Sequence, residues 1–250
     1  MRQLNNIRNH SNWISYYIYK FFTSQKESFT FKCRSGINTT VPKRLLHTYK
    51  EVFFDQIYIK KFPNNDFLKG EPTIIDIGAN VGYFSLFALS KNLKAKVYSY
   101  EPMPNNFELL SKYKKENSKC NFNPFNLAVG SAVGTITLNY NASDSFTTSA
   151  SILPLVGEND QIKVKTTTLA EIIESNNIKQ IDFLKLDCEG SEYDILYNSE
   201  KMLLQNIKTM AIETHIGTEK NHNMVCLVDF LKKNNFELKT EGSIIWGWRI

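Results

Sequence analysis

From residue 73 onward the chain alternates β-branched runs with helical patterns, and this alternation is its strongest constraint on the fold. The first pair is a strand at Thr73–Ile77 and a helix at Tyr83–Lys91. Strands separated by helices form a mostly parallel sheet covered on both faces. Two strands at the C-terminus share a tight turn and must be antiparallel. The other predicted strands are Lys96–Tyr100, Asn121–Val129, Thr135–Tyr140, Gln161–Thr167, Ile181–Leu186, Thr209–Glu213, Phe236–Thr240 and Ile244–Arg249, and the other helices are Pro104–Asn117, Leu169–Asn176, Tyr193–Leu204 and Met224–Asn234.

The first 70 residues differ from the rest in charge. They carry 12 Lys/Arg and 4 Asp/Glu, whereas residues 71–250 carry 18 and 21. Pro and Asn residues interrupt regular structure near Phe62–Pro72. We therefore divide the chain into an N-terminal basic extension, residues 1–70, and a main domain, residues 71–250. The elements predicted for the extension are a helix, a hairpin and a second helix, at Trp13–Phe22, Ser28–Cys33 with Thr39–Val41, and Pro42–Lys50.

Composition excludes several classes of protein. No run approaches the roughly 18 apolar residues of a membrane span, and no cleavage site follows the aromatic segment near residue 20. Four isolated cysteines without a CxxC pair disfavour a zinc site or a disulfide scaffold and favour the cytoplasm. The basic extension suits contact with an anionic substrate, a membrane surface or nucleic acid, or it is simply a solvated face. Nothing in the sequence predicts an oligomeric state.

The segment DIGANVG, residues 76–82, follows the first strand of the main domain and opens a helix. Gly78 allows a sharp turn and the close approach of a ligand at the carboxyl end of the sheet. The Gly-x-x-x-Gly spacing differs from the Gly-x-Gly-x-x-Gly of dinucleotide sites. The carboxylate of Asp76 would repel a diphosphate and attract a cationic amino acid or sulfonium group. A cofactor without phosphates is therefore favoured over NAD.

Glu101 ends the second strand of the main domain, 25 residues after Asp76. An acidic side chain there is placed to accept hydrogen bonds from both ribose hydroxyls of an adenosyl group. The other interpretation is a surface carboxylate that caps the next helix. The neighbouring DIGANVG segment favours the ribose role.

A third polar segment, KLDCEGSE at residues 185–192, follows the strand expected beside the first one. Asp187 would face the cofactor or the acceptor, and Glu189 and Glu192 would orient a hydroxyl, bind a divalent ion or cap the next helix. His215 should reach the same edge of the sheet. Asp187 and His215 are our candidates for a base, although a loop histidine bonded to backbone is an equal alternative for His215. Because capping and acceptor binding account for the glutamates, we expect no metal ion.

Five segments in this order resemble the FkbM family of methyltransferases: IDIGANVGYFSLFA, YSYEP, NLAVG, TTTLAEII and IDFLKLDCEGSEYDIL. The resemblance covers roughly residues 28–250. It implies S-adenosylmethionine as methyl donor, a Rossmann-like α/β fold with a seven-stranded class I methyltransferase sheet, and O-methylation of a sugar, glycan or natural-product hydroxyl. It also implies roles for particular residues: Asp76, Gly78, Asn80, Gly82 and Glu101 in the cofactor loop and ribose contact, Asn126 and Ala128 beside the adenine, and Asp187 and Glu189 in the active-site signature.

Three other functions were weighed against this one. Adenine-N6 methyltransferases resemble one another in a D/N-P-P-Y/F/W tetrad, and cytosine-C5 enzymes use a Pro-Cys nucleophile; the sequence has neither. An NAD-dependent oxidoreductase is disfavoured by the glycine spacing, and a non-catalytic cofactor-binding module is the third alternative. We therefore expect a small-molecule or glycan acceptor rather than nucleic acid. Its selection should depend on the extension and on the Asn141–Asp160 loop.

Overall fold

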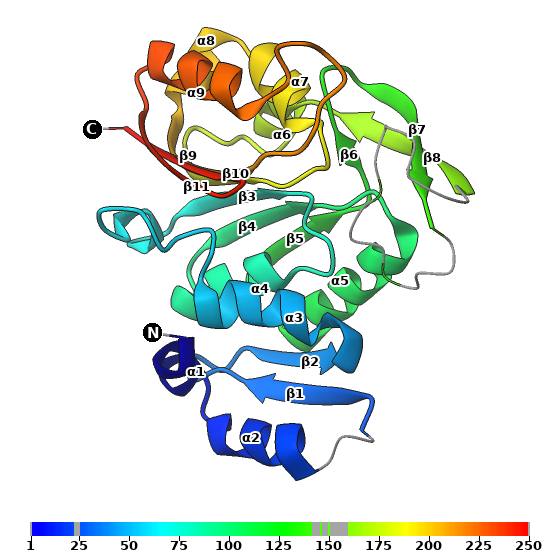
Figure 1. The fold of residues 1–250 in the computed structure, drawn as a ribbon, viewed down its shortest axis with the longest axis vertical. Helices are drawn as coiled ribbons and strands as arrows, with labels where there is room; N and C mark the ends of the chain where they lie inside the picture. Colours follow the sequence, from blue (N-terminus) through cyan, green and yellow to red (C-terminus); the bar gives the residue numbers. More distant parts are fainter. Residues whose placement is uncertain (1, 23–25, 142–145, 147–149, 151–159, 250) are drawn as a thin grey trace.

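The centre of the protein is a seven-stranded sheet in a computed structural model that describes residues 2–22, 26–141, 146, 150 and 160–249 (Figure 1). Every neighbouring pair in the sheet is parallel except those involving the last strand, β12, which is antiparallel to both its neighbours. This confirms the predicted α/β fold with an antiparallel final strand. In spatial order the strands are β11 (Glu237–Glu241), β12 (Ile244–Trp248), β10 (Ile207–Glu213), β9 (Ile181–Leu186), β3 (Thr73–Ile77), β4 (Lys96–Tyr100) and β5 (Asn121–Phe125).

Helices cover both faces of this sheet, as Figure 1 shows. Buried side chains such as Leu169 and Leu231 form a core on one face, and Leu86 and Leu110 belong to a second core on the other. This two-sided burial explains the nearly continuous apolar runs of the central strands. The helices of the first face are α6 (Leu169–Ser175), α7 (Glu192–Tyr197), α8 (Lys201–Gln205) and α9 (Met224–Lys233), and those of the second are α4 (Tyr83–Lys91) and α5 (Pro104–Glu116).

Two predicted elements are divided in the structure. The strand expected over Asn121–Val129 leaves the main sheet after β5, where the Asn126 side chain donates to the carbonyls of Glu101 and Pro102, both at 2.9 Å. Its last part, β6 (Ala128–Val129), joins β8 (Asp160–Thr167) and β7 (Gly134–Tyr140) in a separate three-stranded sheet. The helix expected over Tyr193–Leu204 is two helices, because Glu200 has an extended backbone.

The extension contains α1 (Arg2–Asn9), α2 (Trp13–Phe22) and a hairpin of β1 (Ser28–Lys32) and β2 (Asn38–Pro42). The sequence analysis did not predict α1. The single helix expected over residues 42–50 is a 3-10 turn, η1 (Lys43–Leu45), followed by α3 (Leu46–Lys50) and a π-turn, η2 (Glu51–Asp55). A last 3-10 turn, η3 (Asp66–Leu68), lies in the connection to β3.

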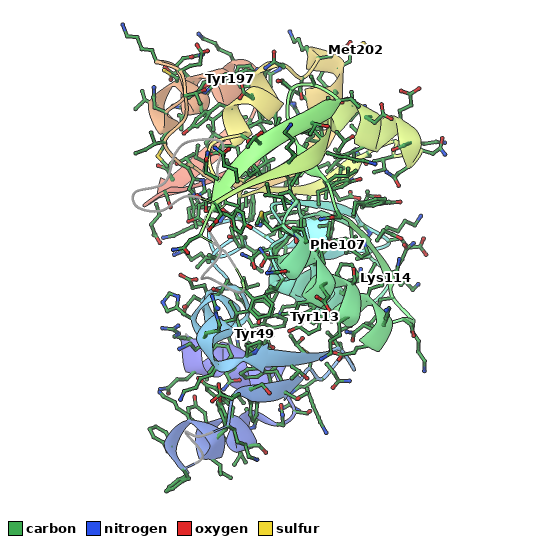
Figure 2. The ribbon with its side chains drawn as sticks, turned by 90° about the vertical axis from the view of Figure 1, so that its right-hand side faces the viewer. Tyr49, Phe107, Tyr113, Lys114, Tyr197 and Met202 are labelled. Atoms are coloured by element: carbon green, nitrogen blue, oxygen red, sulfur yellow. The ribbon has the colours of Figure 1, made fainter. Side chains whose placement is uncertain are left out.

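An aromatic stack joins the extension to the main domain. The ring of Tyr49 lies 4.3 Å from the rings of Phe31 and Phe53, and Phe53 meets Phe87 of α4 edge-on at 5.4 Å. Figure 2 shows Tyr49 and Tyr113 at the junction of the two parts, where the Tyr113 hydroxyl donates to the Thr40 carbonyl at 2.6 Å. The described residues of the extension, 2–22 and 26–70, therefore share one core with α4 and α5 and do not form a loose arm.

Helix α2 has one buried and one exposed face. Tyr16 and Tyr19 are buried, whereas Ile14, Phe21 and Phe22 are exposed. No helix in the described part of the chain is long and apolar enough to cross a membrane. Contact of the basic extension with a membrane surface stays an expectation.

The shared core leads to a prediction about stability. Phe31→Ala should lower the free energy of unfolding by about 3–5 kcal/mol, because a fully buried ring is replaced by a cavity. Phe21→Ala is the matched control, since Phe21 is 65% exposed, and its effect should stay within about 0.5 kcal/mol. Urea denaturation measures both. A separate early transition confined to the extension would contradict the shared core.

Candidate active site

The loop between β3 and α4 approaches the end of β9 very closely. Gly78 has φ +71°, and a Cβ atom there would lie 1.7 Å from the carbonyl oxygen of Asp187. Gly82 has φ +88°, and a Cβ there would lie 2.2 Å from the Leu110 side chain. The two glycines therefore allow the end of β9 and helix α5 to pack closely against the loop. Gly78 lines the first of the two cavities described below, whereas Gly82 lines neither.

A buried lysine holds this loop through a hydrogen bond to its backbone. The Lys185 ammonium donates to the Gly78 carbonyl at 2.7 Å and lies 3.2 Å from an Asp76 oxygen and 3.4 Å from Asp187 Oδ2. Burial lowers the pKa of Lys185, but the carboxylates outweigh it and raise the pKa above its ordinary value. Asp76 also accepts the Ser85 hydroxyl at 2.6 Å and is fully buried. Asp76, expected at the cofactor, thus holds Lys185 and lines neither of the two cavities described below.

A first cavity, of about 630 Å³ counted to its open mouth, lies over the ends of β3, β4 and β9. Glu101 lies in its wall: its carboxylate accepts the backbone N–H groups of Asn80 at 2.8 Å and Met103 at 2.9 Å. Burial raises the pKa of Glu101 to about 7 despite these bonds. Six expected site residues line this cavity: Gly78, Asn80, Glu101, Ala128, Asp187 and Glu189. Asn126 lies outside it and ties the chain after β5 to the end of β4.

Asp187 is held by a residue of the extension. The Tyr58 hydroxyl lies 2.8 Å from Asp187 Oδ2 and 3.2 Å from Glu213 Oε2, and its proton is donated to one of these at a time. Burial and the two carboxylates raise the pKa of Tyr58 well above its ordinary value, so it stays a donor. Burial and Asp187 also raise the pKa of Glu213. Sequence reasoning missed Tyr58, because nothing local marks a contact across 129 residues.

His215 lies beside Asp187, as the sequence predicted for the edge of the sheet. Glu192 Oε1 accepts the His215 backbone N–H at 2.6 Å and lies 3.3 Å from Nδ1. Nε2 lies 3.8 Å from both Asp187 Oδ1 and Glu189 Oε2. Burial lowers the pKa of His215, but Glu192, Glu189 and Asp187 together raise it to about 9. Glu189 has a left-handed backbone, φ +53°, and burial and its acidic neighbours raise its pKa to about 7.

A second cavity meets the first at Asn80, Asp187 and Glu189, which line both. One wall comes from the main domain and includes Lys185 and His215. The opposite wall comes from residues 47–58 of the extension: His47, Thr48, Glu51, Val52, Ile57 and Tyr58. The site thus has two adjoining compartments with carboxylates at their junction.

The strand order, the glycine loop and the acid after the second strand define a Rossmann-like methyltransferase. Residues 76–238 match the Methyltransferase FkbM domain, and the chain belongs to this family. S-adenosylmethionine is its cofactor, and the first cavity fits it, because the cavity is concave and its wall carries Glu101 and the carboxylates near Asp187.

Relatives of this chain are distant in sequence. The chain is 26% identical over 196 residues to the 31-O-demethyl-FK506 methyltransferase FkbM of Streptomyces tacrolimicus, covering 67% of this chain and 73% of the relative. It is 24% identical over 197 residues to the methyltransferase sdnD of Sordaria araneosa, covering 66% and 73%. It is 24% identical over 144 residues to the hexuronic acid methyltransferase AglP of Haloferax volcanii, covering 58% and 56%. Among solved structures, Aeropyrum pernix fibrillarin with bound S-adenosyl-L-methionine is similar with a TM-score of 0.44 at 10% identity, over 89% of this chain and 94% of that one.

The placement of Glu101 predicts its effect on the cofactor. Glu101→Ala should weaken S-adenosylmethionine binding by about 1.5–3 kcal/mol, through loss of charged hydrogen bonds to the ribose. Glu108→Ala on the exposed face of α5 is the control and should leave affinity unchanged. Titration calorimetry on the folded variants measures both. Equal affinities would remove the ribose assignment.

Proposed function

We propose that this protein transfers a methyl group from S-adenosylmethionine to a hydroxyl oxygen of a small-molecule or glycan acceptor. The observation that carries the proposal is the junction of two cavities at Asp187 and Glu189. One cavity suits the cofactor, so the other suits the acceptor. The names of two relatives, a 31-O-demethyl-FK506 methyltransferase and a hexuronic acid methyltransferase, support an oxygen acceptor and a sugar or other small molecule.

The cofactor supplies a methyl group already activated on sulfonium. The protein's part is to bring the acceptor oxygen into line with the methyl carbon and sulfur, which is mainly a matter of position. Glu101 and the loop through Asn80 bind the adenosyl part. The O–C bond forms as the S–C bond breaks, and the hydroxyl proton passes to Asp187 or Glu189 at the junction. His215 and Lys185 balance part of the carboxylate charge.

We assign acceptor recognition to the second cavity. Its outer wall consists of residues 47–58, so the extension shapes the acceptor compartment. The Asn141–Asp160 loop, the other segment expected to select the acceptor, lies mostly outside the described residues. One of its described residues, Ala150, lines the first cavity.

Asp187 provides the sharpest test of the chemistry. Asp187→Asn should lower methyl transfer by about 10²-fold or more, because an amide cannot accept the hydroxyl proton, while cofactor affinity changes little. Asp194→Asn on α7 is the matched control, since its side chain faces His222 and lines neither cavity. The assay measures S-adenosylhomocysteine release with methyl-labelled donor and a panel of sugars, uronic acids and macrolide alcohols.

The product decides the reaction class. A methyl ether identified by mass spectrometry supports the proposal. Label transferred only to nucleic acid or to an amine overturns it, and a fully active Asn variant removes Asp187 from the mechanism.

A further inference from the structure

We propose that Asp187, Glu189 and His215 bind one divalent transition-metal cation at the junction of the two cavities. One ligand atom from each residue lies within 4.8 Å of the other two. The three side chains come from two strand ends, β9 and β10, so the sheet itself holds them together. Two carboxylates with an imidazole form a ligand set used for Mn²⁺, Fe²⁺ and Zn²⁺, whereas Mg²⁺ and Ca²⁺ prefer oxygen ligands alone.

The two oxygens of Asp187 have different surroundings. Oδ2 accepts the Tyr58 hydroxyl at 2.8 Å and faces Lys185 at 3.4 Å. Oδ1 points toward His215 Nε2 at 3.8 Å, which is beyond hydrogen-bonding distance. Among the described residues, none makes a hydrogen bond to Oδ1. Tyr58 and Lys185 thus fix the carboxylate through one oxygen and leave the other directed at the junction.

His215 is oriented as a ligand. The buried Glu192 carboxylate contacts the backbone N–H and Nδ1 of His215. In the neutral, metal-binding form of His215, this contact favours the ring proton on Nδ1 and the lone pair on Nε2. A carboxylate behind an imidazole is the usual outer support of a metal-binding histidine. A simple ion pair would bring Nε2 to about 2.8 Å from an oxygen, yet it stands 3.8 Å from both Asp187 and Glu189. Two ligand atoms that each lie about 2.1 Å from a shared ion are separated from each other by about 3.0–3.8 Å. The spacing of Nε2 from the two carboxylate oxygens therefore suits a shared ion better than a direct ion pair.

The excess negative charge around the three proposed ligands also favours a bound cation. Buried carboxylates without compensation are costly, so a divalent ion stabilises such a cluster. When His215 is neutral and binds the ion, Lys185 faces more acidic groups than it can neutralise. The acidic groups around Lys185 and His215 are Asp76, Asp187, Glu189, Glu192 and Glu213.

This inference replaces the expectation of no metal. That expectation relied on helix capping and acceptor binding as the roles of the glutamates. Instead Glu192 accepts the Gly190 and His215 N–H groups, and Ser191, the N-cap residue of α7, makes no side-chain capping hydrogen bond. Three protein ligands leave coordination positions open, where the ion would lower the pKa of a bound hydroxyl. The hydroxyl proton then passes to the oxygen of Asp187 or Glu189 that does not bind the ion. This consequence rests on the proposed function, whereas metal binding does not.

The test uses the full chain after removal of metals by a chelator, with neither cofactor nor acceptor. Mn²⁺ titration followed by electron paramagnetic resonance should show one saturable ion per chain. Glu192→Gln should weaken binding about 10–100-fold through loss of the support behind His215, and His215→Ala should weaken it at least as much. His47→Ala, at the rim of the second cavity, is the matched control and should leave Mn²⁺ affinity unchanged.

His215→Gln, with anomalous diffraction from Mn²⁺-soaked crystals, keeps the test valid if His215→Ala does not fold. No saturable uptake by the folded wild type, or uptake that the His215 variants leave unchanged, overturns the metal site. The proposed function fails separately: a protein that binds Mn²⁺ but methylates nitrogen refutes O-methylation alone, and an O-methyltransferase that takes up no Mn²⁺ refutes the metal alone.

Discussion

The buried ion pair between Lys185 and Asp76 is the interaction on which the rest of the site depends. The two residues are neighbours in the parallel register of β9 and β3, and the same ammonium reaches the Gly78 carbonyl and Asp187. Loss of one partner in a buried pair typically costs about 3–5 kcal/mol. Because the pair joins the cofactor loop to the acidic segment, it sets the separation of the two sides of the site. Gly78 permits the same approach in the backbone.

The extension supplies a part of the site that the sheet does not provide. Its aromatic core is continuous with that of α4, so η2 packs against this helix beside the sheet. Tyr58, which follows η2, donates a hydrogen bond to Asp187, and residues 47–58 form one wall of the second cavity. The family match begins only at residue 76. The matched domain thus supplies the lining of the first cavity, while the second cavity, which we assign to the acceptor, also depends on a segment outside that domain.

Sequence patterns predicted the helices and strands better than they predicted the contacts between side chains. The β-branched runs and the Gly-x-x-x-Gly loop led to the strands, the cavity loop and the positions of Glu101 and Asp187. Asp76 was predicted from the same motif to face the cofactor, but its carboxylate faces Lys185 because side chains opposite each other in a parallel sheet share one face. Asn126 likewise turns toward backbone carbonyls. A motif specifies where the chain turns more directly than where each side chain points.

The sequence alone determined the order of strands and helices, the family and the carboxyl-end location of the site, because these follow from local periodicity and from motifs of a few adjacent residues. The tertiary structure decided which groups meet: Tyr58 with Asp187 across 129 residues, and Glu192 behind His215 across 23. It also decided the environment of the carboxylates, since burial raises the pKa of Glu101 to about 7, and burial together with neighbouring carboxylates raises the pKa of Glu189 to about 7. Such contacts and burial arise only when the extension and the helices pack against the sheet, and no local pattern encodes them.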